Sequence, residues 1–256
     1  MIIHPLESLS ASEIATAVKL FREYHADEQA FFSSIGLTEP NKLDVLNETN
    51  ISRIVTLTGV DQNSDGGFVC SIDVTKKKVL TATRLPLTAQ VAYNSADFGI
   101  AIMLTKSNKQ WREAVAARGV DVTTDDALAL IQVDPWPAGG YAHDSIPKGH
   151  RAVRCIAFVR EHATDNGYAR PIHGLIAHVD ITAKTITHIE DTGIIPMPTA
   201  SGRFDSESQH SIRSDLKPLE ITQPEGTSFS VVGNKILWQG FDVRASVHPV
   251  NGLVLH

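Results

Sequence analysis

The sequence predicts an α+β fold class: two small α+β domains in tandem, each a helix packed on an antiparallel meander, followed by an all-β segment. Three observations support this prediction. A helical hydrophobic period precedes several alternating runs rich in β-branched residues. The same order then occurs a second time. Finally, alternating apolar residues return after a stretch rich in proline, serine and glycine.

A capping box predicts the helix that opens the first domain, over residues 1–86. Ser10 and Glu13 have the spacing at which each side chain can bond the backbone N–H of the other residue. The apolar residues that follow lie on one helix face: Ile14, Ala17, Val18, Phe21 and Tyr24. Three extended runs then predict the meander, at residues 51–58, 68–74 and 79–85. A turn at residues 63–67 separates the first two runs.

The second domain, over residues 87–195, repeats this order. Thr88 is predicted to cap a helix that runs to about Leu104, and Ser107 opens a second capping box for a helix that stops at Gly119. Four strand-like runs follow, at residues 127–133, 152–160, 172–181 and 185–190. Residues 179–184 (Val-Asp-Ile-Thr-Ala-Lys) resemble residues 72–77 (Ile-Asp-Val-Thr-Lys-Lys), each at the turn of a predicted hairpin. The two domains are therefore expected to be related.

The last part of the chain has a different composition. Residues 196–218 are predicted to be a linker, because proline, serine, glycine and charged residues dominate there. Beyond it, residues 219–256 contain alternating apolar runs separated by turns, which predicts a new all-β segment. The final run reaches His256 without a break. We expect a truncated chain, because the unpaired edge of an apolar strand invites aggregation.

The composition argues against several classes of protein. The 256 residues are 42% hydrophobic and carry a formal charge of −6, which is typical of a globular protein. No basic run is longer than residues 76–78, so a nucleic-acid partner is not expected. The N-terminus has no basic leader, and the longest apolar run, 98–104, is too short to span a membrane. We expect a cytoplasmic protein without a membrane partner.

Residue spacing alone predicts no active site. Cys70 and Cys155 lie in apolar alternating runs and are expected to be buried thiols. Among eleven histidines there is no H-x-H, and the best metal-ligand pair is His178 with His188, which a hairpin would place opposite each other. Without a third ligand or a nearby carboxylate, we favour exposed strand histidines. Nucleophile-elbow and phosphate-binding glycine motifs are absent.

Three turns contain aromatic residues, at residues 134–141, 166–171 and 234–239. Aromatic side chains near strand ends usually close a hydrophobic core. The alternative is that they line a channel or an interface, where a rigid amphipathic ring is useful.

These segments resemble the copper-containing primary amine oxidases. The similar stretches are residues 168–175 followed by 179–180, residues 215–229 and residues 252–256, together with residues 4–10 and 134–136. They occur in collinear order along essentially the whole chain. Members of this family carry two small, mutually similar α+β domains ahead of a β-sandwich catalytic domain. The resemblance therefore implies that residues 219–256 are the truncated start of that β-sandwich.

The resemblance also implies a reaction and its cofactors. The family oxidises primary amines with oxygen to aldehydes, ammonia and hydrogen peroxide, and its members are homodimers. It uses topaquinone, made from a tyrosine in an Asn-Tyr-Asp/Glu motif, and copper held by three histidines. None of the four tyrosines of this chain has that context, and the H-x-H copper pair is missing. We therefore expect no catalytic residue, copper or topaquinone in this chain, and the remainder of the catalytic domain as its partner.

One position is assigned by the resemblance. In family members an aromatic residue just before the Ala-x-Pro turn of the second small domain borders the amine entry channel, and Tyr168 occupies that position here. The alternative is a tyrosine that caps its own hairpin. The expected function is the N-terminal scaffold and channel wall of an amine oxidase. The alternatives are a catalytically inactive short homologue that acts as a binding module, and a histidine-based metal hydrolase.

Overall fold

The computed structural model of the chain describes residues 3–25, 30–47, 51–61, 66–200, 202–208, 211 and 213–256. It divides into two compact units: Met1–Ala92 with Pro218–His256, and Tyr93–Lys217. The described residues form three four-stranded antiparallel sheets together with helices, which confirms the α+β class. The turn expected at residues 63–67 lies largely outside the described residues.

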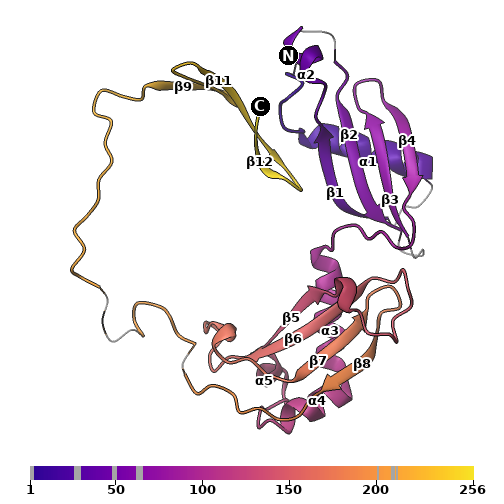
Figure 1. The fold of residues 1–256 in the computed structure, drawn as a ribbon, viewed down its shortest axis with the longest axis vertical. Coiled ribbons are helices and arrows are strands. Elements are labelled where there is room, and N and C mark those ends of the chain that lie inside the picture. Colours follow the sequence, from indigo (N-terminus) through magenta and orange to yellow (C-terminus); the bar gives the residue numbers. More distant parts are fainter. Residues whose placement is uncertain are drawn as a thin grey trace. The chain divides into compact units, whose positions relative to one another are not determined.

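The first unit begins with a helix packed on a four-stranded meander. Its elements are α1 (Ala11–His25), β1 (Phe31–Thr38), α2 (Lys42–Leu46), β2 (Ile54–Val60), β3 (Gly67–Asp73) and β4 (Lys78–Arg84). The strands are ordered β1-β2-β3-β4, and α1 lies across one face of the sheet (Figure 1). The capping box is confirmed, because Ser10 N–H donates to the Glu13 carboxylate at 2.8 Å and Glu13 N–H donates to Ser10 Oγ at 3.3 Å.

The buried stripe of α1 differs from the predicted one at its end. Ala17 and Phe21 are fully buried, as expected, whereas Tyr24 is 61% exposed. The stripe continues instead through His25, four residues after Phe21, whose ring stacks on Phe21 at 4.9 Å between centroids. His25 is on the stripe in place of Tyr24 because a step of four residues from Phe21 places its ring against Phe68 of the sheet.

The sequence pattern does not predict β1, the edge strand of this sheet. The pairing of β1 with β2 shifts register between Phe32 and Ser34. This bulge inserts one residue and breaks the alternation that identifies a strand. The predicted strands of this unit differ from β2, β3 and β4 only at their ends.

The second unit repeats the arrangement of helices on one face of a meander (Figure 1). Its elements are α3 (Ser95–Ser107), α4 (Lys109–Ala116), α5 (Asp125–Ala129), β5 (Ile131–Pro137), η1 (Gly139–Tyr141), β6 (Ala152–Val159), η2 (Gly167–Ala169), β7 (Leu175–Asp180) and β8 (Thr185–Asp191). The strands are ordered β5-β6-β7-β8. Ala101 of α3 and Trp111 and Val115 of α4 are fully buried in the core between helices and sheet.

Two helix starts differ from the predicted ones because asparagine provides the cap. Thr88 lies in a loop, and Asn94 caps α3 by accepting the N–H groups of Ala96 and Asp97 at 2.9 and 3.0 Å. Asp97 completes a capping box with Asn94. At the next helix Asn108, rather than Ser107, is the cap. In both cases the asparagine amide oxygen accepts a hydrogen bond from an N–H group of the first turn.

The start of the strand predicted at residues 127–133 is helical. Residues 125–129 form α5, and β5 begins only at Ile131. Thr124 caps this short helix by accepting the N–H of Ala127 at 3.1 Å. Asp125 and Asp126 place negative charge in its first turn, where the helix dipole favours it.

The two similar sequence stretches, residues 72–77 and 179–184, form the same kind of turn. Lys77 and Lys184 both have φ of 53°, a left-handed conformation that is uncommon outside glycine. In each hairpin the aspartate of the motif, Asp73 or Asp180, accepts the backbone N–H three residues later, at 2.8 and 2.9 Å. The two meanders therefore share their final turn in atomic detail.

A buried arginine connects helix and sheet at the same place in both units. Arg53 directly precedes β2 and contacts the capping-box carboxylate of Glu13 at 2.5 Å; Arg151 directly precedes β6 and contacts that of Asp97 at 2.6 Å. Both guanidinium groups are largely buried. Each arginine also donates its backbone N–H, at 3.0 Å, to a threonine of the shared hairpin motif.

The third sheet belongs to the first unit. It contains β9 (Phe229–Val232), β10 (Lys235–Trp238), β11 (Phe241–His248) and β12 (Gly252–Leu255), in the order β12-β11-β10-β9. These strands follow the alternating runs of the sequence. The described residues between β8 and β9 form no helix or strand.

We expect Arg151→Met to lower the free energy of unfolding of the second unit by about 3 kcal/mol, because it leaves the Asp97 carboxylate buried without its partner. Urea unfolding followed by tryptophan fluorescence measures this change. The matched control is Lys109→Met, which removes a 90% exposed lysine paired with Glu113 and should change stability far less. Equal effects of the two substitutions would contradict the role given to Arg151.

Candidate functional site

The face of the β5–β8 sheet that the helices leave uncovered presents polar and aromatic side chains. Val133 of β5 faces the core, and successive side chains of a strand point to opposite faces, so Asp134 lies on the uncovered face. The strand register aligns four residues in one row across this face: Trp136, Arg154, His178 and His188. This face holds the residues of chemical interest in the second unit.

Tyr168, the position assigned from the sequence, lies in η2 between β6 and β7. Asn166 caps this turn by accepting the N–H of Tyr168 at 3.0 Å. The Tyr168 ring packs edge-on against Phe158 of β6, with 4.8 Å between centroids. A Cβ on Gly167 would lie 2.7 Å from the side-chain oxygen of Gln132, so glycine allows the turn to approach β5 closely.

Asp134 connects the two exposed aromatic residues of this face. Its Oδ2 accepts a hydrogen bond from the Tyr168 hydroxyl at 2.9 Å and another from Trp136 Nε1 at 3.2 Å. The hydrogen bond to the carboxylate favours the protonated phenol and therefore raises the pKa of Tyr168. Trp136 and Tyr168 are 58% and 57% exposed. The three side chains form an accessible carboxylate–aromatic cluster.

The sequence pattern indicates only part of this cluster. Residues two apart on a strand share a face, so the neighbourhood of Asp134 and Trp136 follows from alternation. The contact with Tyr168 depends on how η2 folds back over β5, which no local pattern encodes. The expectation that the turn aromatics close a core is wrong for all four of them, which are 47–78% exposed: Trp136, Tyr141, Tyr168 and Trp238.

The predicted histidine pair is confirmed, but its surroundings differ from expectation. His178 and His188 are cross-strand partners in the β7–β8 hairpin. His178 is buried rather than exposed, and His143 of the β5–β6 connection stacks on His188 with 4.1 Å between ring centroids. A carboxylate is also present, because Glu190 Oε2 lies 3.0 Å from His178 Nε2. The sequence gives no signal for the approach of His143.

Burial favours the neutral form of His178, the buried member of this histidine cluster. It lowers the pKa of His178, and the nearby His143 and Arg154 lower it further against the opposing effect of Glu190. The hydrogen bond from His178 lowers the pKa of Glu190. Within the described ranges, no group of three or more His, Cys, Asp or Glu residues is arranged to hold a metal ion.

The two cysteines are buried free thiols, as expected. Desolvation raises the pKa of both Cys70 and Cys155 to about 11. Both side chains therefore remain protonated at neutral pH and are poor nucleophiles.

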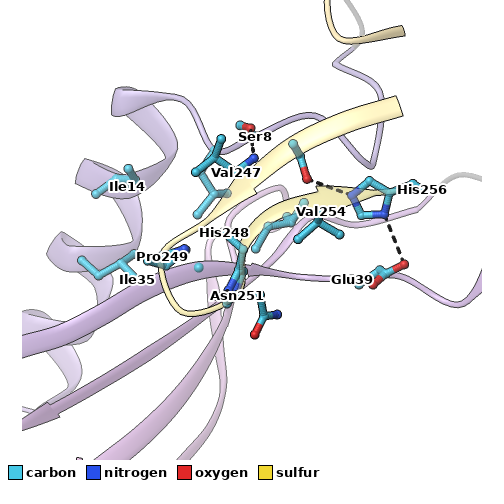
Figure 2. A pocket seen from close by; sticks show the side chains of 14 residues that line it. Ser8, Ile14, Ile35, Glu39, Val247, His248, Pro249, Asn251, Val254 and His256 are labelled. Atoms are coloured by element: carbon cyan, nitrogen blue, oxygen red, sulfur yellow. Dashed lines mark hydrogen bonds and ion pairs between the residues drawn. The ribbon is translucent and has the colours of Figure 1, made fainter. Parts of the chain in front are cut away.

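A cavity of about 440 Å³ lies in the first unit, between β1 and the β11–β12 hairpin (Figure 2). His256 bridges its two sides, contacting Ser246 at 2.8 Å and Glu39 at 3.3 Å. His248 packs onto Gly36, where a Cβ would lie 2.4 Å from Nε2. These contacts hold the hairpin against β1, and they place the Ser246 hydroxyl beside Nε2 of His256 while Glu39 lies beside Nδ1. No helix within the described ranges is both long and apolar enough to cross a membrane.

Comparison with known protein families matches part of the chain. Residues 96–207 match the family described as "Copper amine oxidase, N3 domain". This region contains α3 from its second residue, the whole β5–β8 sheet and Tyr168.

Two bacterial relatives are similar along nearly the whole chain. A primary amine oxidase of Arthrobacter sp. (strain P1) is 34% identical over 254 residues, and the histamine oxidase of Arthrobacter globiformis is 33% identical over 258 residues. Each alignment covers 99% of this chain. The chain spans only 38% and 37% of the length of these two relatives.

A solved structure shares the fold. The crystal structure of a copper-containing benzylamine oxidase from Hansenula polymorpha aligns with 99% of this chain and 42% of its own, with a TM-score of 0.79 and 18% sequence identity.

We expect the stability of the second unit to fall as the pH drops below 6.5, the ordinary pKa of histidine. The pKa of His178 is lowered in the folded chain, so the unfolded chain binds the proton more readily in this range. Urea unfolding at a series of pH values measures the effect, which His178→Gln should reduce. His173→Gln, at an exposed histidine of the same unit, should leave it unchanged. A His178→Gln profile identical to that of the unmodified chain would contradict this assignment.

Proposed function

The chain belongs to the copper-containing primary amine oxidase family as its N-terminal region, and we propose that it forms the scaffold and part of the substrate-channel wall of such an enzyme. The complete enzyme would oxidise primary amines with oxygen, releasing aldehyde, ammonia and hydrogen peroxide, and would be a homodimer. The collinear similarity to two bacterial amine oxidases along 99% of this chain supports the proposal.

The residues of this chain do not fit the cofactors of the family. Its sequence contains no H-x-H pair and no tyrosine in an Asn-Tyr-Asp/Glu context. The part of the chain that the structure describes has no three-ligand group for a metal. In this proposal copper and topaquinone are held by a part of the enzyme that these 256 residues do not supply.

The proposed contribution of this chain is a rigid surface along the path of the amine. Tyr168 is suited to this role because its ring is exposed while its backbone and hydroxyl are both fixed, by Asn166 and Asp134. The contact with Phe158 also makes it part of its own hairpin. A tyrosine that packs on its hairpin can therefore still present one side of its ring to a passing substrate.

The purified chain is expected to be inactive on its own. After incubation with Cu²⁺ in air it should develop no quinone absorption band, because no tyrosine has the precursor context, and it should produce no hydrogen peroxide with 1,4-diaminobutane. The complete Arthrobacter relative treated in the same way is the positive control. Amine-dependent peroxide from the chain alone would overturn the proposal that it lacks the catalytic centre.

The channel role of Tyr168 can be tested in a chimaera in which this chain replaces the aligned region of the Arthrobacter primary amine oxidase. Tyr168→Ala should raise KM for amines several-fold with a smaller change in kcat, because it alters binding along the path and not the reacting centre. Tyr24→Ala, at a similarly exposed tyrosine of the first unit, is the matched control. Unchanged KM in an active Tyr168→Ala chimaera would contradict the channel role.

A further inference from the structure

The cavity between β1 and the β11–β12 hairpin is lined by a serine, a histidine and a carboxylate that contact one another. Ser246 Oγ lies 2.8 Å from Nε2 of His256. Nδ1 of the same ring lies 3.3 Å from Oε1 of Glu39 (Figure 2). A hydroxyl beside one histidine nitrogen and a carboxylate beside the other is the arrangement that activates serine nucleophiles on several unrelated folds.

The pairing of β11 with β12 brings the serine and the histidine together. Ser246 is the cross-strand partner of Val254. The backbone of His256 is bonded to that of Arg244 in both directions, at 2.9 and 3.1 Å. Side chains two apart on a strand share a face, so Ser246 and His256 lie on one face as diagonal neighbours. The register of the hairpin therefore fixes this pair.

The histidine ring is held so that Nε2 can accept a proton. The His256 side chain is only 9% exposed, whereas that of Glu39 is 65% exposed. A carboxylate beside Nδ1 favours the tautomer with the proton on that nitrogen, which leaves the lone pair of Nε2 for the Ser246 hydroxyl. Because water screens the exposed carboxylate, we expect Glu39 to orient the ring and to add little electrostatic stabilisation.

The backbone after Ser246 offers a donor for the negative charge that develops during nucleophilic attack. The N–H of Val247 donates to Ser8 Oγ at 3.4 Å, which is longer than an ordinary hydrogen bond. In α/β-hydrolases the N–H of the residue after the nucleophile belongs to the oxyanion hole. A donor already shared with a serine stabilises an oxyanion less than a preorganised hole does, so we expect slow turnover.

The rest of the cavity is suited to a short aliphatic group. Its volume of about 440 Å³ lies in the range of small-molecule sites. None of its described lining residues is a lysine or an arginine, which disfavours an anionic ligand. Six of the lining residues are aliphatic: Leu9, Ile14, Ile35, Leu37, Val247 and Val254.

We propose that Ser246, His256 and Glu39 form a site that accepts an acyl group from an activated ester or thioester of a short aliphatic acid. Ser246 Oγ attacks the carbonyl carbon and forms the new C–O bond, while His256 Nε2 takes the hydroxyl proton. The bond from the carbonyl carbon to the alcohol or thiol then breaks, and His256 returns the proton to this leaving group. Glu39 is a positioning residue for the ring.

Water completes the reaction. It attacks the acyl-serine with His256 again as the base, which releases the carboxylic acid and restores the Ser246 hydroxyl. No electron is transferred in these steps, so the activity is separate from amine oxidation, for which the chain alone is expected to be inactive.

The purified chain is tested with 4-nitrophenyl butyrate, and the released 4-nitrophenolate is followed by absorbance. We expect a burst that approaches one equivalent per chain, followed by slow turnover, with the butyryl group on Ser246 in the digested chain by mass spectrometry. Ser246→Ala should abolish the burst. The matched control is Ser230→Ala, which removes an exposed serine from β9 of the same sheet and should leave the burst unchanged.

Two further variants test the other members of the site. His256→Gln should lower the rate constant of the burst about 100-fold, the size of effect expected for loss of a general base. Glu39→Gln should lower it about fivefold and leave the ester concentration at half-maximal rate unchanged, because a positioning residue acts through the ring. A change in that concentration with no change in the rate constant would contradict the role of Glu39.

A fluorophosphonate gives a measurement on the unmodified chain that does not depend on how any variant folds. Its phosphorus should bond to Ser246 Oγ with loss of fluoride, and the peptide that contains Ser246 should gain the corresponding mass. No adduct, an adduct confined to other residues, or an ester burst that survives Ser246→Ala would each overturn the proposal. The channel test at Tyr168 is independent of these results, because that residue belongs to the second unit.

Discussion

The contact between a buried arginine and the capping-box carboxylate of a helix is the interaction on which both units depend. Glu13 and Asp97 already use their carboxylates to complete the first turn of a helix. Arg53 and Arg151 bring a charge from the start of a strand to that same carboxylate, and their backbone N–H groups bond to the hairpin motif. Helix start, second strand and final hairpin are thereby fixed together in each unit.

In each unit, helices pack on one face of the meander and leave its other face uncovered. In the second unit the free face presents two separate groups of side chains. One is the cluster of His143, His178 and His188, where burial lowers the pKa of His178. The other is the open cluster of Asp134 with its two aromatic neighbours, where a negative charge remains accessible. The difference arises because the β5–β6 connection covers one part of the face only.

Local patterns were sufficient for much of the fold. The Ser10 capping box, most strands and the His178–His188 pair follow from spacing and alternation alone. The bulged strand β1 could not be recognised, because its extra residue destroys the alternation. The caps at Asn94 and Asn108 compete with nearby serine and threonine residues, and only the backbone geometry selects between them. Of the site, Tyr168 was assigned by resemblance, whereas its bond to Asp134 joins residues 34 apart in the chain and depends on tertiary packing.

The turn that presents Tyr168 is positioned by contacts of Asn166 and Gly167. Gly167 lies close to the Gln132 side chain of β5, and Asn166 caps the turn; neither contact involves the aromatic group at position 168. That side chain can therefore be exchanged during evolution without rebuilding the loop that presents it. In such an arrangement the chemical character of this exposed position can change while the supporting framework stays the same.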